Sequence, residues 1–84
     1  MIRLADLRSW RAISEPGKWT VREDFAGAHV LLIASGTEEN MRIIGVAPKA
    51  LSLLARALKD GAIKDQKHVN EASAILDVAG VQWR

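Results

Sequence analysis

The sequence predicts an α+β fold: a small antiparallel sheet with an N-terminal helix and two C-terminal helices, in the order αβββαα. Two branched apolar stretches, His29–Ile33 and Met41–Val46, flank a short polar segment and indicate neighbouring strands. Two stretches with helical apolar spacing follow, between Pro48 and Ala79. A length of 84 residues leaves room for one domain, spanning residues 1–84.

The first stretch, Met1–Ser14, has the spacing of an amphipathic helix. Leu4, Leu7 and Trp10 recur every three residues, and Ile13 completes a narrow apolar stripe. The Glu-Pro-Gly sequence that follows stops this helix, because proline cannot continue it and glycine permits a reversal of the chain.

Two strands are expected next, with different surroundings. Lys18–Asp24 is apolar only at Trp19 and Val21 on one side and polar on the other, which is typical of an edge strand defended by charge. In contrast, both sides of His29–Ile33 are apolar. This second strand is therefore predicted to be central and covered on two faces.

The stretch Met41–Val46 allows two interpretations. Its adjacent isoleucines, followed by a valine, favour an extended strand that pairs with the preceding one through the turn Ser35–Asn40. Alternatively, Thr37 caps a short helix with two glutamates in its first turn, and Gly45 ends it. We favour the strand and keep the helix as the alternative.

The C-terminal half contains the two predicted helices. Pro48 suits a first helical turn. The first of the two helices is expected to run to Asp60, with Gly61 in the position where glycine commonly ends a helix. Leucines at i, i+3 and i+7 give this helix an apolar stripe. Asp65 is expected to cap the last helix, which runs to about Ala79.

The alternating tail Val81–Arg84 is a candidate fourth strand. We expect it to cover the outer edge of the Met41–Val46 strand, with Val81 and Trp83 turned toward the core. The alternative is that a second copy of the chain pairs at this edge and forms a two-fold dimer. We favour the tail, and therefore a monomer over a homodimer, and expect that deleting the tail destabilises the monomer or drives association.

Composition narrows the classes of function. Twelve cationic and ten anionic residues give a formal net charge of +2, which is too small to imply nucleic-acid binding by itself. The absence of cysteine excludes disulfides and thiolate metal sites and fits a reducing cytoplasm. No apolar run approaches the ~20 residues of a membrane span. We therefore expect a cytoplasmic protein that does not act at a membrane.

No catalytic, cofactor or metal site is expected. The two histidines, His29 and His68, lack carboxylates at ligand spacing, and no hydroxyl residue lies in a nucleophile motif. The sequence therefore predicts a protein that is not an enzyme and needs no cofactor.

The candidate interaction residues are cationic or aromatic. Three cations of the helix predicted from Pro48 share one face, at i, i+7 and i+10, where they can meet phosphates or an acidic protein patch. Two arginines and a tryptophan near the N-terminus, and a tryptophan near residue 84, are further candidates, since both residue types are common interface anchors. The set is Lys49, Arg56, Lys59, Arg8, Arg11, Trp10 and Trp83.

Reading of DNA by the two C-terminal helices is not favoured. Ala57 and Gly61 have the spacing of a helix-turn-helix motif, but the positions that this motif buries next are Lys67 and Asn70. A small nucleic-acid-binding regulator that uses the basic helix face is therefore only the alternative function.

In size and style the chain resembles the small orphan proteins that phages and mobile elements encode to block host defence, anti-CRISPR proteins among them. The shared features are a single-domain length, no cysteine, an α+β outline and no catalytic signature. The resemblance implies a viral, non-enzymatic inhibitor that docks on a host protein or protein complex. Several such inhibitors are strongly acidic DNA mimics, whereas this chain is slightly basic, so docking on a protein subunit is expected.

Overall fold

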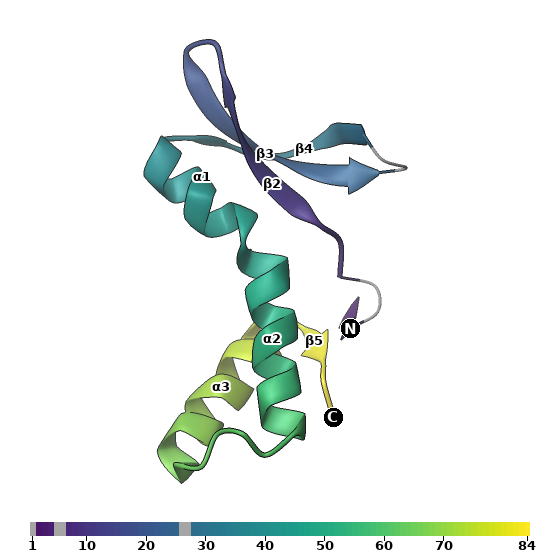
Figure 1. Cartoon of the computed structure of the whole chain (residues 1–84), viewed down its shortest axis with the longest axis vertical. Coiled ribbons are helices and arrows are strands. Elements are labelled where there is room, and N and C mark those ends of the chain that lie inside the picture. Colours follow the sequence, from purple (N-terminus) through teal and green to yellow (C-terminus); the bar gives the residue numbers. More distant parts are fainter. Residues whose placement is uncertain (1, 5–6, 26–27) are drawn as a thin grey trace. The chain divides into compact units, whose positions relative to one another are not determined.

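The computed structural model of the protein describes residues 2–4, 7–25 and 28–84. The fold is α+β, with the elements labelled in Figure 1. They are β1 (Ile2–Arg3), β2 (Trp10–Glu15), β3 (Lys18–Phe25), β4 (Ala28–Gly36), α1 (Glu38–Gly45), α2 (Ala47–Lys59), α3 (Gln66–Val78) and β5 (Val81–Gln82).

The chain forms two compact units. The sheet unit is Arg8–Pro48, and the helical unit combines Met1–Leu7 with Lys49–Arg84. The sheet unit therefore contains β2, β3, β4 and α1, and the helical unit contains β1, α3, β5 and nearly all of α2. That the whole chain acts as one domain stays a prediction from its length.

The sheet unit is an antiparallel sheet with the strand order β2-β3-β4. β2 and β3 form a hairpin in which Glu15 pairs with Lys18 across the two-residue loop. Gly17 in this loop has φ of 79°, a backbone conformation that glycine adopts without the strain of a Cβ. The predicted Glu-Pro-Gly reversal is thus confirmed, but it joins two strands.

The predicted N-terminal helix is wrong for the described residues. Residues 2–3 and 10–15 are strands, while Met1 and residues 5–6 lie outside the described part of the chain. The apolar residues that recur every three positions belong to two different units, so their spacing does not mark one face of a helix. Leu4 and Leu7 pack on the core of the helical unit, whereas Trp10 and Ile13 belong to β2 and pair with β3.

The strand predicted at Lys18–Asp24 is confirmed as β3, but it lies at the centre of the sheet and not at its edge. Two of its charged side chains have partners on the neighbouring strand β2. Arg22 pairs with Glu15, and Glu23 accepts a hydrogen bond from Trp10. A central strand with two-sided pairing therefore tolerates charge here.

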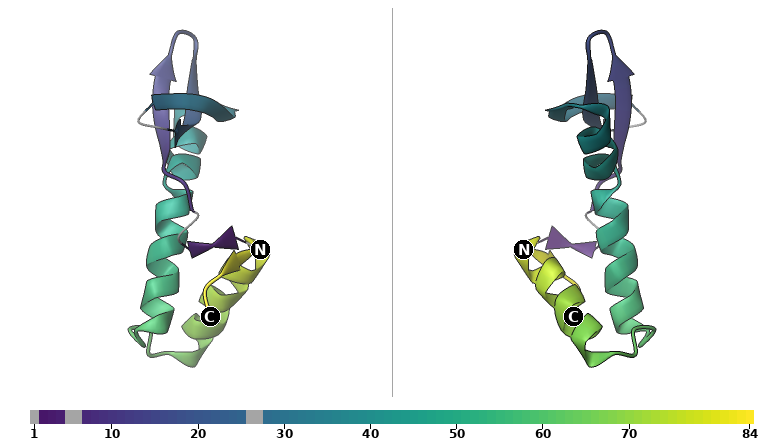
Figure 2. Two further views of the ribbon diagram at one scale, coloured as in Figure 1. Left: turned by 90° about the vertical axis from the view of Figure 1, so that its right-hand side faces the viewer. Right: turned by 90° about the vertical axis from the view of Figure 1, so that its left-hand side faces the viewer.

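The strand predicted at His29–Ile33 is confirmed as part of β4, but its predicted central position is wrong. Among the described residues β4 pairs only with β3, and Leu31 and Leu32 are about half exposed, at 52% and 49%. The pairing with β3 is interrupted by two register shifts. Such bulges bend a strand, and Figure 2 shows β4 crossing the β2–β3 hairpin obliquely.

The second strand of the expected pair is absent, and the alternative interpretation is confirmed: Glu38–Gly45 is the helix α1. Thr37 is its N-cap, and its Oγ1 accepts a hydrogen bond from the Asn40 N–H at 3.3 Å. Met41 and Gly45 are the buried residues of α1. The apolar stretch is therefore helical because capping and a buried face outweigh the strand preference of its isoleucines.

The helical unit is built on the hairpin of α2 and α3, joined by residues 60–65 (Figure 2). Both helices were predicted, and Asp65 caps α3 by accepting from the Lys67 N–H at 2.9 Å. Gly61 and Gly80 follow the two helices with φ of 68° and 74°. The buried core of this unit is formed by Ala55, Leu76 and Val81, with Leu4, Leu7, Leu51, Leu54, Leu58 and Trp83 packed against it.

The predicted role of the tail is partly wrong. Val81 and Gln82 do form a strand, and Val81 is buried as expected. They pair in parallel with Ile2 and Arg3, however, and not with Met41–Val46, which is helical. The tail thus closes the core of the helical unit, and a sheet of four antiparallel strands does not form in the described part of the chain.

Candidate functional site

The sheet unit contains an open groove of about 270 Å³ between β2 and the C-terminal end of α1. It is lined by Trp10, Arg11, Ala12, Arg42, Gly45 and Val46. We call it the β2–α1 groove. It brings the predicted interaction residue Trp10 together with two residues that were not predicted, Arg42 and Val46. The predicted Arg11 also lines it, but Arg11 alternates with Trp10 along β2, so its side chain lies on the opposite face of the sheet. An open groove of this size suits a segment of another macromolecule better than an enclosed small molecule.

Trp10 is held in place by a side-chain hydrogen bond. Its Nε1 donates to Glu23 Oε1 at 3.1 Å, and the two residues lie directly opposite each other on β2 and β3. The bond satisfies the polar end of the indole and leaves the ring as an oriented apolar surface at the groove. The sheet register therefore positions this aromatic side chain.

Arg42 is positioned from two sides. Its Nε donates to Glu38 Oε2 at 2.8 Å, one helical turn earlier, and its guanidinium lies 5.2 Å from the centre of the Trp19 ring. The side chain is still 64% exposed. An arginine restrained in this way loses less conformational entropy when it binds a ligand.

Arg42 was missed because the stretch around it was interpreted as a strand. In that interpretation Arg42 is a single cation among apolar residues. In the helical alternative, the spacing of Glu38 and Arg42 is the i, i+4 spacing of a stabilising ion pair. This spacing was the signal in the sequence that indicated a preorganised arginine.

The floor of the groove depends on a close approach of α1 to β2. A Cβ on Gly45 would lie 3.0 Å from the backbone nitrogen of Ala12, so any larger residue there makes a tight contact that α1 or β2 must shift to accept. Val46, which follows as the C-cap of α1, is 58% exposed and adds an apolar surface beside Trp10 and Arg42.

The other predicted interaction residues lie elsewhere. Arg8 is exposed in the segment before β2 but does not line the groove. Lys49, Arg56 and Lys59 are exposed on α2, which has no acidic residue along its length. Trp83 packs on the core of the helical unit, with the Arg84 guanidinium 4.7 Å from its ring centre.

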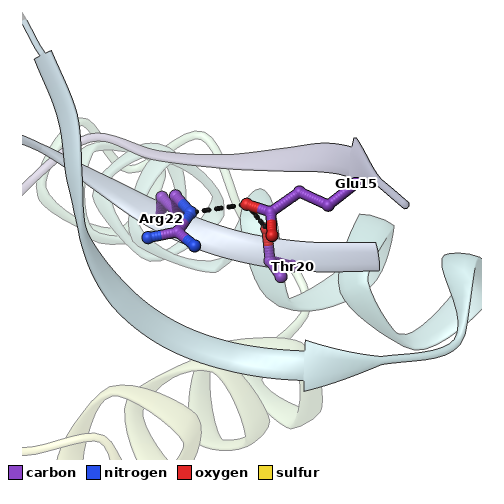
Figure 3. Close-up of polar contacts among 3 residues, drawn as sticks. All are labelled: Glu15, Thr20 and Arg22. Atoms are coloured by element: carbon purple, nitrogen blue, oxygen red, sulfur yellow. Dashed lines mark hydrogen bonds and ion pairs between the residues drawn. The ribbon is translucent and has the colours of Figure 1, made fainter. Parts of the chain in front are cut away.

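A second polar cluster lies on the sheet face opposite to Ala12 and Val21 (Figure 3). Glu15 Oε1 accepts from Arg22 Nε at 2.7 Å and from Thr20 Oγ1 at 3.1 Å. The hydrogen bond from Arg22 is the main reason that the pKa of Glu15 is lowered, and Glu15 in turn raises the pKa of Arg22. These groups satisfy one another and cover the fully buried Thr20, so the cluster is structural.

The described residues contain no group of three or more histidine, cysteine or acidic residues that could hold a metal ion. None of their helices combines the length and apolarity needed to cross a membrane. No protein-family model matches the chain, and comparisons with curated proteins and with solved structures give no match either.

Proposed function

We propose that this protein is a non-enzymatic interaction module that acts by binding a partner protein through the β2–α1 groove. The observation that carries the proposal is the meeting of Trp10, Arg42 and Val46 in one open groove. Tryptophan and arginine are the residue types that most often dominate the free energy of protein–protein binding. Both Trp10 and Arg42 are already oriented by bonds within the protein.

The test is affinity capture with matched variants. The wild-type chain, the groove variant Trp10→Ala/Arg42→Ala and the control variant Lys49→Ala/Arg56→Ala are each immobilised and exposed to a bacterial lysate. We expect a partner that the wild type and the control retain and the groove variant loses. Retention of the same proteins by all three variants would contradict the proposal, once circular dichroism shows that each variant is folded.

A narrower form of the proposal is that the partner belongs to a host defence complex. It rests on the resemblance in size and style to anti-CRISPR proteins and on no shared motif. The direct test is to add purified CRISPR effector complexes to the capture experiment and to assay their target cleavage with and without the protein. Unchanged cleavage by every complex that the protein retains would remove the inhibitor role and leave the interaction module.

The second candidate function is nucleic-acid binding by α2. The observation that favours it is that Lys49, Arg56 and Lys59 are exposed on a helix without carboxylates. Phosphate contacts of this kind weaken steeply as salt is added. An electrophoretic shift at low salt that disappears in the Lys49→Ala/Arg56→Ala/Lys59→Ala variant would support it. No shift at micromolar protein would exclude it.

A further inference from the structure

The outer edge of β4 has no strand beside it in the described part of the chain. β4 pairs with β3 on one side, and no described strand pairs with its other side. The other outer strand, β2, has α1 against its backbone, where Gly45 lies on Ala12. The tail was expected to cover an open edge of the sheet, but Val81 and Gln82 pair with β1. The expectation of a monomer depended on that cover, which the tail does not give.

β4 is also apolar without being buried. Its sequence from Ala28 to Gly36 contains no carboxylate, lysine, arginine or proline. From residue 31 to residue 36 none of its residues is buried, and Leu31 and Leu32 are about half exposed. In the neighbouring β3, by contrast, Thr20 and Val21 are fully buried. Covering the two leucines would remove apolar surface from water and so favour association.

The two edges of the sheet differ in their protection. A strand with an unpaired side offers its backbone N–H and C=O groups to any chain that can pair with it, and charged residues or proline usually prevent this. β2 carries Arg11 and Glu15 and is followed directly by Pro16. Because β4 has no such residue, it is the edge that is open to pairing.

The middle of β4 presents its backbone groups outward. The Asp24 N–H donates to the Ser9 carbonyl oxygen, so in the alternation of an antiparallel pair Arg22 turns its N–H and C=O toward β2. Leu32 is the partner of Arg22 on β4, and its own N–H and C=O therefore point away from β3. Leu32 is also the central residue of Ala28–Gly36, so pairing along the whole strand is centred on it.

From these observations we infer that the protein forms a two-fold dimer in which β4 pairs antiparallel with β4 of a second copy. Pairing along the full strand places Leu32 opposite Leu32 of the other copy, and the two three-stranded sheets become continuous. Each copy gains backbone hydrogen bonds along β4 and covers its exposed leucines.

The occupant of this edge is a second copy and not another protein, because β4 is self-complementary. When β4 lies antiparallel on itself, no carboxylate, lysine or arginine meets a like charge in any register. The same lack of charge leaves nothing with which the edge could select a different partner by electrostatic complementarity. A two-fold contact also closes after two copies, whereas pairing of β4 with β2 of the next copy would continue into an open fibre.

This inference does not rest on the proposed function. β2 and β4 are the two outer strands of the sheet, so pairing through β4 leaves the β2–α1 groove of each copy at the other edge. The dimer therefore carries two such grooves. A partner that presents two matching segments would bind the dimer more tightly than the monomer, because the second contact forms at a high effective concentration.

The first test measures the mass of the full chain by size-exclusion chromatography with light scattering over a range of concentrations. We expect the wild type to have twice the mass of the chain. Leu32→Lys should have the monomer mass, because it places two like charges directly opposite each other. Leu53→Lys is the matched control, since Leu53 of α2 is 54% exposed and Leu32 is 49% exposed. This variant should stay dimeric.

A dimer that survives Leu32→Lys would overturn the inference. So would a monomeric wild type, which would leave the edge of β4 to a strand of another protein. Masses that grow beyond the dimer with concentration would mean that the contact does not close, and they would overturn it as well.

A second test keeps the inference falsifiable if Leu32→Lys fails to fold. The chain has no cysteine, so single cysteines can be introduced at residues 31, 32 and 33 and, as a control, at Leu53. A residue that faces its own copy across an antiparallel pair lies within the Cα separation that a disulfide spans. We expect mild oxidation to link Leu32→Cys into a covalent dimer most readily. No link at any of the three β4 positions, or an equally fast link in Leu53→Cys, would overturn the inference.

Discussion

Gly45 of α1 lies directly against Ala12 of β2. A Cβ on Gly45 would lie 3.0 Å from the Ala12 nitrogen and 3.3 Å from the Ala12 Cβ. The first of these atoms belongs to the backbone of a paired strand, which has little freedom to move. The contact therefore couples the position of the helix to the edge of the sheet, and with it the shape of the β2–α1 groove.

The first prediction is that Gly45→Ala destabilises the protein. Overpacking costs about 1–3 kcal/mol, and alanine offsets at most roughly 1 kcal/mol of this as a better helix former, so we expect a net loss of up to about 2 kcal/mol. Gly36→Ala is the control, because the Cβ there would meet only the flexible end of Met41 at 3.4 Å. Urea unfolding measures both variants. Equal stability of Gly45→Ala and the wild type would show that α1 is free to shift away from β2.

The second prediction concerns the start of α1. Thr37→Ala removes the side-chain acceptor for the Asn40 N–H, and loss of an N-cap costs about 1 kcal/mol. Ser35→Ala, two residues earlier in β4, changes an exposed hydroxyl that caps nothing and should stay within about 0.5 kcal/mol of the wild type. Thermal unfolding followed by circular dichroism compares them. A loss in Ser35→Ala as large as in Thr37→Ala would contradict the capping role.

The third prediction is a pH dependence of stability. The hydrogen bond from Arg22 lowers the pKa of Glu15 in the folded protein. In the unfolded chain the pKa of Glu15 is higher, so its contribution to stability is present above the unfolded pKa and disappears as the pH falls through the folded pKa. Stability should therefore decline on acidification, and Glu15→Gln should remove part of that decline.

The control for this pH dependence is Glu39→Gln, which removes an exposed carboxylate of α1 that has no ion pair with the described residues. Urea midpoints are measured between neutral pH and pH 3 for the wild type and both variants. If the acid-induced loss is the same in Glu15→Gln as in the wild type, Glu15 is not its source.

The fourth prediction uses an unsatisfied donor in the helical unit. Trp83 Nε1 is buried and has no hydrogen-bond partner among the described residues. Trp83→Phe removes this donor. Burying a donor without a partner costs roughly 1 kcal/mol or more, so its removal offsets the contact area that the smaller ring loses. We expect Trp83→Phe to be close to the wild type in stability and Trp83→Ala to lose about 2–3 kcal/mol. A Phe variant as unstable as the Ala variant would mean that the indole N–H does have a partner.

The part of the fold that could be predicted has local causes. Both helices after Pro48 follow from apolar spacing and from Asp65 and the glycines that bound them. The β2–β3 reversal follows from its proline and glycine. These features depend on residues a few positions apart, so the sequence pattern indicates them directly.

The part that could not be predicted depends on long-range pairing. Whether β3 or β4 is central is decided by partners such as Glu15 for Arg22 and Trp10 for Glu23, which no local pattern gives. The same holds for the candidate site. Trp10 was predicted as an interaction residue for its chemistry alone, whereas Arg42 and Val46 join it only because α1 is a helix.

The parallel pairing of β1 with β5 has a consequence for the order in which the protein folds during synthesis. The sheet unit is one continuous segment, Arg8–Pro48, and all its contacts are available once that segment has left the ribosome. The helical unit needs Ile2 and Val81 together. Contacts of such long sequence separation form slowly. Ile2 also has no pairing partner until Val81 has been synthesised. The residues that shape the groove thus belong to one continuous segment, whereas the helical core cannot close before Ile2 and Val81 are both present.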